Sequence, residues 1–327
     1  MATLYGTDRR DTLSGGADDD TLRGLRGDDW LYGKGGDDAL IGGEGNDHLF
    51  GDKGDDELFG HEGRDRVCGG LGNDGLSGQE GADTLRGGKG IDSLGGAEGP
   101  DGERFRDHFF GGDGDDTIFV GIRDVVDGGD GFDHFYLTLP DPEADGARAD
   151  FTGLLEDGAR VHGTTLRELE RGVVFATDFA DRIVMGSGGV VIEAGTGDDR
   201  LVSGGYNTLY AREGDDTLVV TAPGGRLYGG EGADTFAVTS IGAFFNQFIF
   251  DLDASDVIDL HRIDADVNTP GNQAFTLVDA PSGAAGELYL TFGGYYTTVA
   301  INVDATDPND DYIAIVGDHT GFTNFIL

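Results

Sequence analysis

Aspartates recur at every ninth residue in the first third of the chain. With Gly6 as position 1 of a nine-residue unit, ten units run without a gap to Gly95, and position 6 is aspartate in all ten. The residues before each acid are rich in glycine, which favours tight turns. Carboxylates and turn carbonyls are hard oxygen donors, a set that suits Ca²⁺ with its roughly six to eight oxygen ligands better than zinc or copper. Mg²⁺ fits less well, because it demands stricter octahedral geometry.

The remaining positions of the unit define the element that carries these acids. Position 1 is always glycine and position 8 is always Leu or Val. Positions 1 to 6 therefore form a turn and positions 7 to 9 a short strand, in which only position 8 points inward. One buried side chain per unit offsets too little of the entropy lost by ordering the backbone, and stacked acids repel one another. We therefore expect a bound cation to complete the fold, so that binding and folding are coupled.

The repeat continues less regularly beyond Gly95. Residues 96–101 interrupt the period, residues 137–175 do not follow it, and strand-like alternation of apolar and polar residues replaces it after Val238. The looser units begin at Gly102, Gly111, Gly128, Ala194, Ala211 and Gly229, and a less regular one contains Asp181-Arg182-Ile183.

The unit resembles the G-G-x-G-x-D-x-U-x nonapeptide of the RTX (repeats-in-toxin, hemolysin-type) family, a calcium-binding repeat. The resemblance implies an all-β protein, a right-handed parallel β-roll in which two units make one coil, with a C-terminal β cap. It also implies multiple calcium ions between the turns of neighbouring coils, held by position 6 and by backbone carbonyls. Asp29 and Asp47 would then lie on one edge of the roll, and Asp38 and Asp56 on the other.

The predicted calcium ligands are the position 6 aspartates, together with carbonyls of the preceding glycine-rich turns. Asp11 is left out because Arg9 and Arg10 stand in its turn. The set is Asp20, Asp29, Asp38, Asp47, Asp56, Asp65, Asp74, Asp83, Asp92, Asp107, Asp116, Asp133, Asp199, Asp216 and Asp234.

The end of the sequence resembles the C-terminal domain of serralysin-type secreted metalloproteases. The matching motifs are ADTFAV, SDVIDL, AGELYL and the final TNFIL, in which Asn324 stands where the family has an acid. The resemblance implies a cap on the roll and an uncleaved signal for the type I secretion machinery, hence an extracellular or cell-surface location. The alternative is an ordinary β-domain whose last residues fill its core.

These patterns predict four segments. They are a first roll at 1–136 with strict repeats at 6–95 and looser units at 102–136, a divergent linking section at 137–185, a second short roll at 186–237, and a β cap and secretion domain at 238–327.

Charge and chemistry narrow the functional classes. The formal net charge of −41 opposes binding to nucleic acid or anionic membranes, and no apolar run is long enough for a membrane span. His61-Glu62 does not form a zinc-protease motif, because Asp65 stands where the second histidine must be. The sequence contains no G-x-S-x-G motif, and its seven histidines are scattered. We predict that the protein is not an enzyme, and no residue supports a hydrolytic activity hidden in 137–175.

Position 9 offers a surface for contact with another molecule. It is apolar in four successive units, at Tyr32, Ile41, Phe50 and Phe59, and it points away from the interior. Such outward ladders could support self-association, or they could be single exposed side chains or a surface that the chain itself covers. We predict a secreted calcium-binding protein with a structural, surface or matrix role. The alternative is a calcium-dependent folding and type I export module of an enzyme or toxin whose effector domain is absent here.

Overall fold

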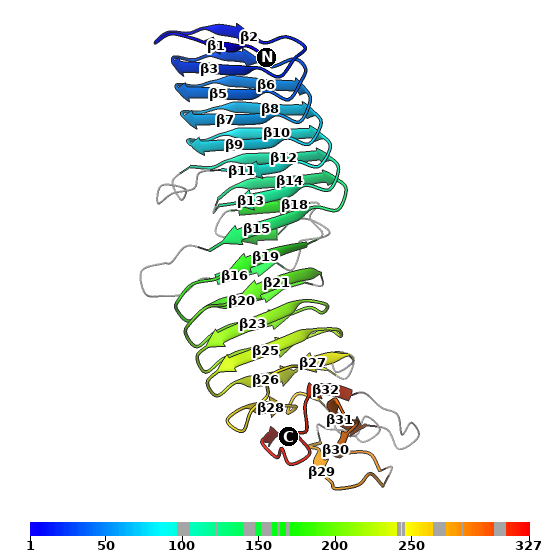
Figure 1. Ribbon diagram of the computed structural model, residues 1–327. Helices are drawn as coiled ribbons and strands as arrows, with labels where there is room; N and C mark the ends of the chain where they lie inside the picture. Colours follow the sequence, from blue (N-terminus) through cyan, green and yellow to red (C-terminus); the bar gives the residue numbers. More distant parts are fainter. Residues whose placement is uncertain are drawn as a thin grey trace. The chain divides into compact units, whose positions relative to one another are not determined.

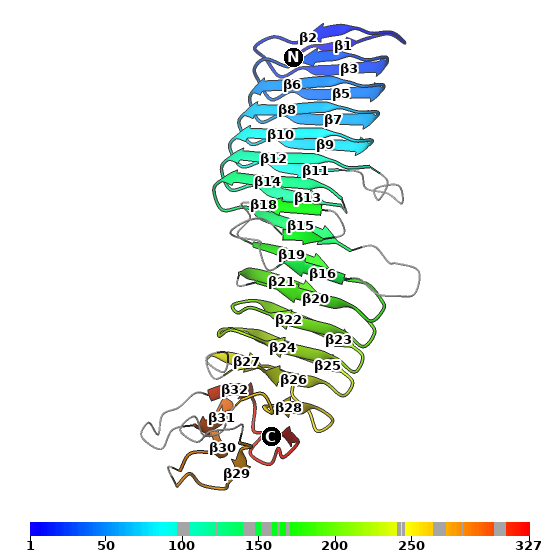
Figure 2. The ribbon, with the colours of Figure 1, turned by 180° about the vertical axis from the view of Figure 1, so that it is seen from behind.

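The structure is a computed structural model in which every named element is a β-strand (Figures 1 and 2). The residues that it describes are 1–96, 105–121, 123–139, 148–151, 159–161, 164–167, 171–186, 188–240, 243, 246–263, 273–282, 284–303 and 312–327. The chain divides into two compact units, unit 1 comprising Met1–Pro140 and Gly153–Val173 and unit 2 comprising Asp141–Thr152 and Val174–Leu327. Much of the predicted linking section and most of the predicted interruption, including Asp101, lie outside the described residues. The four predicted segments stay a prediction.

Unit 1 contains two parallel sheets whose strands alternate along the chain. The first sheet stacks β1 (Thr3–Tyr5), β3 (Thr21–Arg26), β5 (Ala39–Glu44), β7 (Glu57–Glu62), β9 (Gly75–Glu80), β11 (Ser93–Gly95), β13 (Thr117–Val120) and β15 (His134–Thr138). The second stacks β2 (Thr12–Ser14), β4 (Trp30–Tyr32), β6 (His48–Lys53), β8 (Arg66–Leu71), β10 (Thr84–Lys89), β12 (His108–Asp113), β14 (Val125–Asp130) and β18 (Thr164–Arg167), with β17 (Ala159–Val161) antiparallel to β18.

The nine-residue period explains this arrangement. Each unit of the repeat supplies one strand, and each strand pairs with the strand two units later, so that Leu31 lies beside Leu49 and Leu40 beside Leu58. These position 8 side chains are fully buried between the two sheets. The predicted all-β parallel roll is thereby confirmed, with an inward apolar column in each sheet. The predicted limit of the strands to positions 7 to 9 is wrong for most units, because strands such as β6 and β7 continue through positions 1 to 3 of the next unit.

The pairing continues across residues 97–104. Strand β10 pairs in parallel with β12, and Leu85 lies beside Phe109, which is also fully buried. A segment inserted between two turns therefore leaves the register of the stack intact.

Unit 2 repeats the alternation and then changes topology. One sheet stacks β21 (Gly189–Glu193), β23 (Thr208–Glu213), β25 (Arg226–Glu231) and β27 (Gln247–Ile249), and the other stacks β16 (Arg148–Phe151), β20 (Arg182–Met185), β22 (Arg200–Ser203), β24 (Thr217–Val220), β26 (Thr235–Val238) and β28 (Val257–Asp259). Strand β19 (Arg171–Phe175) contains the boundary between the units.

Strands from the end of the chain pair with the last strand of each sheet of unit 2. β32 (Tyr312–Val316) pairs with β27, and β33 (Phe325–Ile326) pairs with β28. β31 (Tyr296–Asn302) is antiparallel to β32 and to β30 (Glu287–Phe292), which pairs in parallel with β29 (Thr276–Leu277). Within the described residues, no helix is long and apolar enough to cross a membrane.

Candidate metal sites along the turn edges

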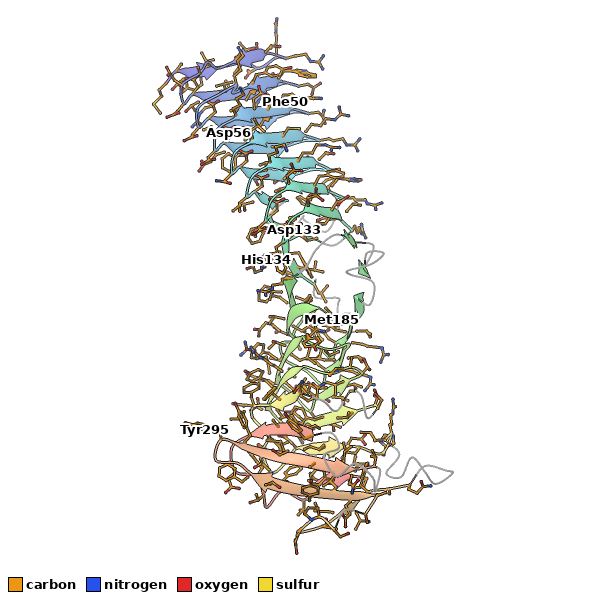
Figure 3. The ribbon with its side chains drawn as sticks, turned by 90° about the vertical axis from the view of Figure 1, so that its right-hand side faces the viewer. Phe50, Asp56, Asp133, His134, Met185 and Tyr295 are labelled. Atoms are coloured by element: carbon orange, nitrogen blue, oxygen red, sulfur yellow. The ribbon has the colours of Figure 1, made fainter. Side chains whose placement is uncertain are left out.

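Strand pairing brings the position 6 aspartates into columns, at the points where a turn enters a strand. Figure 3 labels two of these acids, Asp56 and Asp133. In each column, one carboxylate oxygen accepts the backbone N–H of the acid one coil earlier. The Asp29 N–H donates to Asp47 Oδ1 at 2.7 Å, and the Asp38 N–H donates to Asp56 Oδ1 at 2.7 Å. This bond fixes each carboxylate against the next turn.

The predicted ligands lie in three such columns, which also include Asp11, Asp124, Asp181 and Asp256. In unit 1 one edge carries Asp11, Asp29, Asp47, Asp65, Asp83, Asp107 and Asp124, and the other carries Asp20, Asp38, Asp56, Asp74, Asp92, Asp116 and Asp133. In unit 2 a single column contains Asp181, Asp199, Asp216, Asp234 and Asp256.

The second carboxylate oxygen of most of these acids is buried without a hydrogen bond. A buried carboxylate oxygen without a partner is costly, because it has lost its water and gained nothing in return. Within the described residues this holds for Oδ2 of Asp29, Asp38, Asp47, Asp56, Asp65, Asp74, Asp83, Asp92, Asp116, Asp199, Asp216 and Asp234. A cation at these atoms would supply the missing partner.

The glycine at position 1 leaves the space beside this oxygen. A Cβ atom added to Gly33 would lie 2.3 Å from Asp38 Oδ2 and 2.9 Å from the carbonyl oxygen of Gly51 in the next coil. The glycine is therefore required because a carboxylate oxygen and a carbonyl oxygen approach its Cα closely. This cradle of oxygen atoms fits the hard donor set of Ca²⁺.

The glycine at position 4 has a different role. Gly54 has φ of 125°, and an added Cβ would lie 2.0 Å from the carbonyl oxygen of Gly36. Successive turns thus stack with their backbones in close contact. Within the described residues no three His, Cys, Asp or Glu side chains converge on one point. A metal ion here would therefore take most of its ligands from turn carbonyls.

Burial raises the pKa values of aspartates in these columns. Desolvation raises the pKa of Asp65 to about 7 and that of Asp83 to about 8, and the charges of neighbouring acids add to both shifts. In unit 2, desolvation raises the pKa of Asp199 to about 8, with Asp216 and Asp181 adding to the shift. Without a bound cation, these acids bind protons more tightly than an exposed aspartate does.

The ends of the columns differ from their interiors. The second oxygen of Asp20 accepts the Gly16 N–H at 2.8 Å, although Asp20 belongs to the predicted ligand set. Four acids outside that set also lie at column ends. The second oxygens of Asp11, Asp124 and Asp256 each accept a nearby backbone N–H, and Asp181 is bonded in the same way by Thr177. Asp124 and Asp256 each precede an x-apolar pair, which is the signal that could have found them.

Further columns, also missed in the sequence, run through position 5. In one of them the Asp55 N–H donates to Asp37 Oδ1 at 2.9 Å, and the Asn73 N–H donates to Asp55 Oδ1 at 2.7 Å. These side chains are exposed, so such columns stabilise the stacked turns at the surface. Asp or Asn at position 5 is the sequence signal for them.

Comparison with known proteins agrees with this geometry. A family model of the RTX calcium-binding nonapeptide repeat, which spans four copies, matches residues 5–40, 41–76, 77–101, 101–122, 175–205 and 202–220, together half of the chain. Among curated protein sequences, none matches significantly.

Two solved structures are similar at low identity. One is the AlgE6R3 subunit of a mannuronan C5-epimerase from Azotobacter vinelandii, with 20% identity, a TM-score of 0.30, and coverage of 57% of this chain and 86% of that one. The other is the extracellular lipase LipA from Serratia marcescens, with 15% identity, a TM-score of 0.19, and coverage of 89% of this chain and 40% of that one.

The fold and the carboxylate columns together define a calcium-binding parallel β-roll. The chain belongs to the RTX calcium-binding nonapeptide repeat family, as the sequence predicts.

The cradle at position 1 gives a direct test within one turn. Replacing Gly33 by alanine is expected to lower the free energy of unfolding in calcium by about 1–3 kcal/mol, the usual cost of overpacking. Gly35→Ala is the matched control, because its added Cβ would meet nothing closer than 3.8 Å, and we expect a change within about 0.5 kcal/mol. Urea unfolding at saturating calcium measures both. Equal loss in the two variants would show that the space beside Asp38 Oδ2 is not restricted.

Proposed function

We propose that this chain is a secreted protein that folds on binding calcium outside the cell and then has a structural, surface or matrix role. The observation that supports this most directly is the set of columns of buried carboxylate oxygens without hydrogen-bond partners, which alternate with stacked turn carbonyls. When bound, calcium supplies the positive charge that these columns lack. The ligands in this proposal are the aspartates of the predicted set, each with carbonyls of its own turn.

The proposed location outside the cell follows from the expected calcium affinity. Extracellular calcium modules bind at roughly 10⁻⁴–10⁻³ M, far above the calcium level of the cytosol. A chain with such sites would stay unfolded inside the cell, which suits export through a type I machinery. We assign the export signal and the cap to residues 238–327. In support, Phe325 lies beside Ile258, so the last residues close one sheet of unit 2.

Self-association is the proposed structural activity. On the second sheet of unit 1, the rings of Tyr32 and Phe50 stack with centroids 5.2 Å apart and planes 7° apart. On the first sheet, Ile41 lies beside Phe59. All four side chains are half-buried. Each ladder is thus an ordered apolar strip that another copy of the chain could cover.

Size-exclusion chromatography with light scattering tests this role, in chelator and in a few millimolar calcium. We expect calcium to produce ordered assemblies, and we expect Phe50→Ser with Phe59→Ser to leave a compact monomer. Tyr295→Ser, at a side chain that is 83% exposed in unit 2, is the control and should assemble normally (Figure 3). If wild-type protein stays a compact monomer in calcium, the structural role is wrong and a folding and export module of a secreted enzyme or toxin becomes the better hypothesis.

We also propose that the chain has no catalytic activity of its own. The acids that recur along the edges repeat the same environment in coil after coil, whereas an active site requires one distinct arrangement. Turnover by the purified chain in a broad screen of hydrolase substrates would contradict this proposal.

A further inference from the structure

The two edges of unit 2 differ in chemistry. One edge carries the column of acids from Asp181 to Asp256. On the other, strand register places Val190 beside Asn207, and Gly225 beside Gln247. None of these four residues has a carboxylate, whereas unit 1 carries acids along both edges.

Asn207 accepts the same backbone hydrogen bond as an aspartate of the columns, but its second polar atom is a nitrogen that donates. It is 1% exposed, and its Oδ1 accepts the Val190 N–H at 3.2 Å, as each aspartate accepts the N–H of the preceding coil. Its Nδ2 donates to the carbonyl oxygen of Gly186 at 2.8 Å and to Ser203 Oγ at 3.1 Å. Asp216, in the acid column, has an unpaired buried oxygen instead of this nitrogen.

Gln247 has the same combination of one accepted and two donated hydrogen bonds, further along the same edge. It is completely buried, and its Oε1 accepts the Gly225 N–H at 2.9 Å. Its Nε2 donates to the carbonyl oxygens of Ala222 and Ala243, each at 2.8 Å. A Cβ atom on Gly225 would lie 2.5 Å from Oε1, so the absence of a side chain at that position makes room for the longer amide.

We propose that the side-chain amides of Asn207 and Gln247 replace bound calcium on this edge, so that unit 2 takes up calcium along one edge only. Backbone carbonyls at a turn edge need a positive partner, which a carboxylate cannot provide without a cation. An amide N–H₂ group provides it directly, and it carries no charge to be neutralised. The proposal rests on the calcium function proposed for the acid columns.

The proposal predicts a measurable difference between the sheet of unit 2 that contains β23 and β25 and the first sheet of unit 1. In chelator, the backbone amides of β23 and β25 should keep more protection from hydrogen exchange than those of the first sheet of unit 1. The strands next to Asn207 and Gln247 should therefore be the part of the chain that is ordered before calcium binds. Protection of this kind reports local opening directly.

Two isosteric substitutions in the full chain test the assignment, with hydrogen exchange and bound calcium as the readouts. Asn207→Asp and Gln247→Glu each turn two donated hydrogen bonds into a buried unpaired oxygen, so protection of β23 and β25 in chelator should fall about tenfold or more. Calcium should restore it. The reverse change, Asp216→Asn, should remove at least one calcium ion per chain. Asn73→Asp adds the same charge at an exposed turn and should change neither readout.

The outcomes separate the two proposals. Wild-type protection in chelator for both Asn207→Asp and Gln247→Glu would overturn the amide assignment, because the donated hydrogen bonds would then contribute nothing. Loss of protection that calcium restores in neither variant would show that the amides do not occupy cation positions. Failure of the wild-type chain to bind calcium would refute the proposed function instead. The measurement in chelator needs no calcium and tests the hydrogen bonds of the amides even then.

Discussion

In excess chelator at neutral pH, the chain is expected to lose most of its far-ultraviolet β-sheet signal and to expand, and millimolar calcium is expected to reverse both changes. The physical reason is the burial of acids such as Asp47 and Asp65, each with an oxygen that has no hydrogen-bond partner. A site filled at one hundred times its dissociation constant contributes about 2.7 kcal/mol, so four such sites contribute about 11 kcal/mol. This is as large as the whole free energy of unfolding of a typical domain, which is about 5–15 kcal/mol.

Circular dichroism and light scattering in chelator, with added calcium and with the same concentration of magnesium, measure the effect. Magnesium is the control, because its strict octahedral demand fits stacked turn carbonyls poorly. A full β-sheet spectrum in chelator would refute both calcium-dependent folding and the proposed export of an unfolded chain. Unit 1 should respond more strongly than unit 2, since it has acids on both edges.

The strict repeat made much of the fold predictable. A fixed period of nine residues determines which side chains share a column, so the spacing of position 8 is enough to predict the core residues Leu31 and Leu49. The same period brings Asp29 and Asp47 together on one edge. Local sequence alone suffices here because each coil contacts only its neighbours.

Some of the residues that leave the period were missed. Asp124 closes a column across a spacing of 17 residues, and Gln247 bonds Gly225 across 22 residues. A fixed repeat cannot assign these partners, because a turn of different length changes which residue enters the strand. The function of Asn207 is hidden for another reason, since an isolated amide in a sequence gives no sign that it stands in an acid's place.

Acid is expected to stabilise the calcium-free fold, in contrast to its effect on the calcium-bound form. Burial raises the pKa of Asp56 to about 6 and that of Asp65 to about 7, against an ordinary value of 3.8. A raised pKa in the folded state means that the fold favours the protonated carboxyl. The resulting stability is fully present below the unfolded pKa and is lost as the pH rises through about 6 to 7.

Calcium reverses this dependence, because it needs the ionised carboxylate and displaces the proton as it binds. The β-sheet signal in chelator should therefore be larger at pH 5 than at pH 8, and the denaturation midpoint in calcium should be lower at pH 5. Calcium added at pH 6.5 to weakly buffered protein should release protons. Equal β-sheet signals at the two pH values in chelator would contradict the raised pKa values.

Adjacent residues provide the matched pair of variants for this experiment. Asp56→Asn removes one buried titrating group and leaves an amide that can donate to turn carbonyls, so the β-sheet signal in chelator at pH 8 should rise and its dependence on pH should weaken. Asp55→Asn removes an exposed carboxylate whose Oδ1 accepts the Asn73 N–H, a bond that asparagine can keep. It should leave the dependence unchanged. An equal response in both variants would mean that net charge controls the calcium-free fold, whereas a response in Asp56→Asn alone would trace it to the buried column.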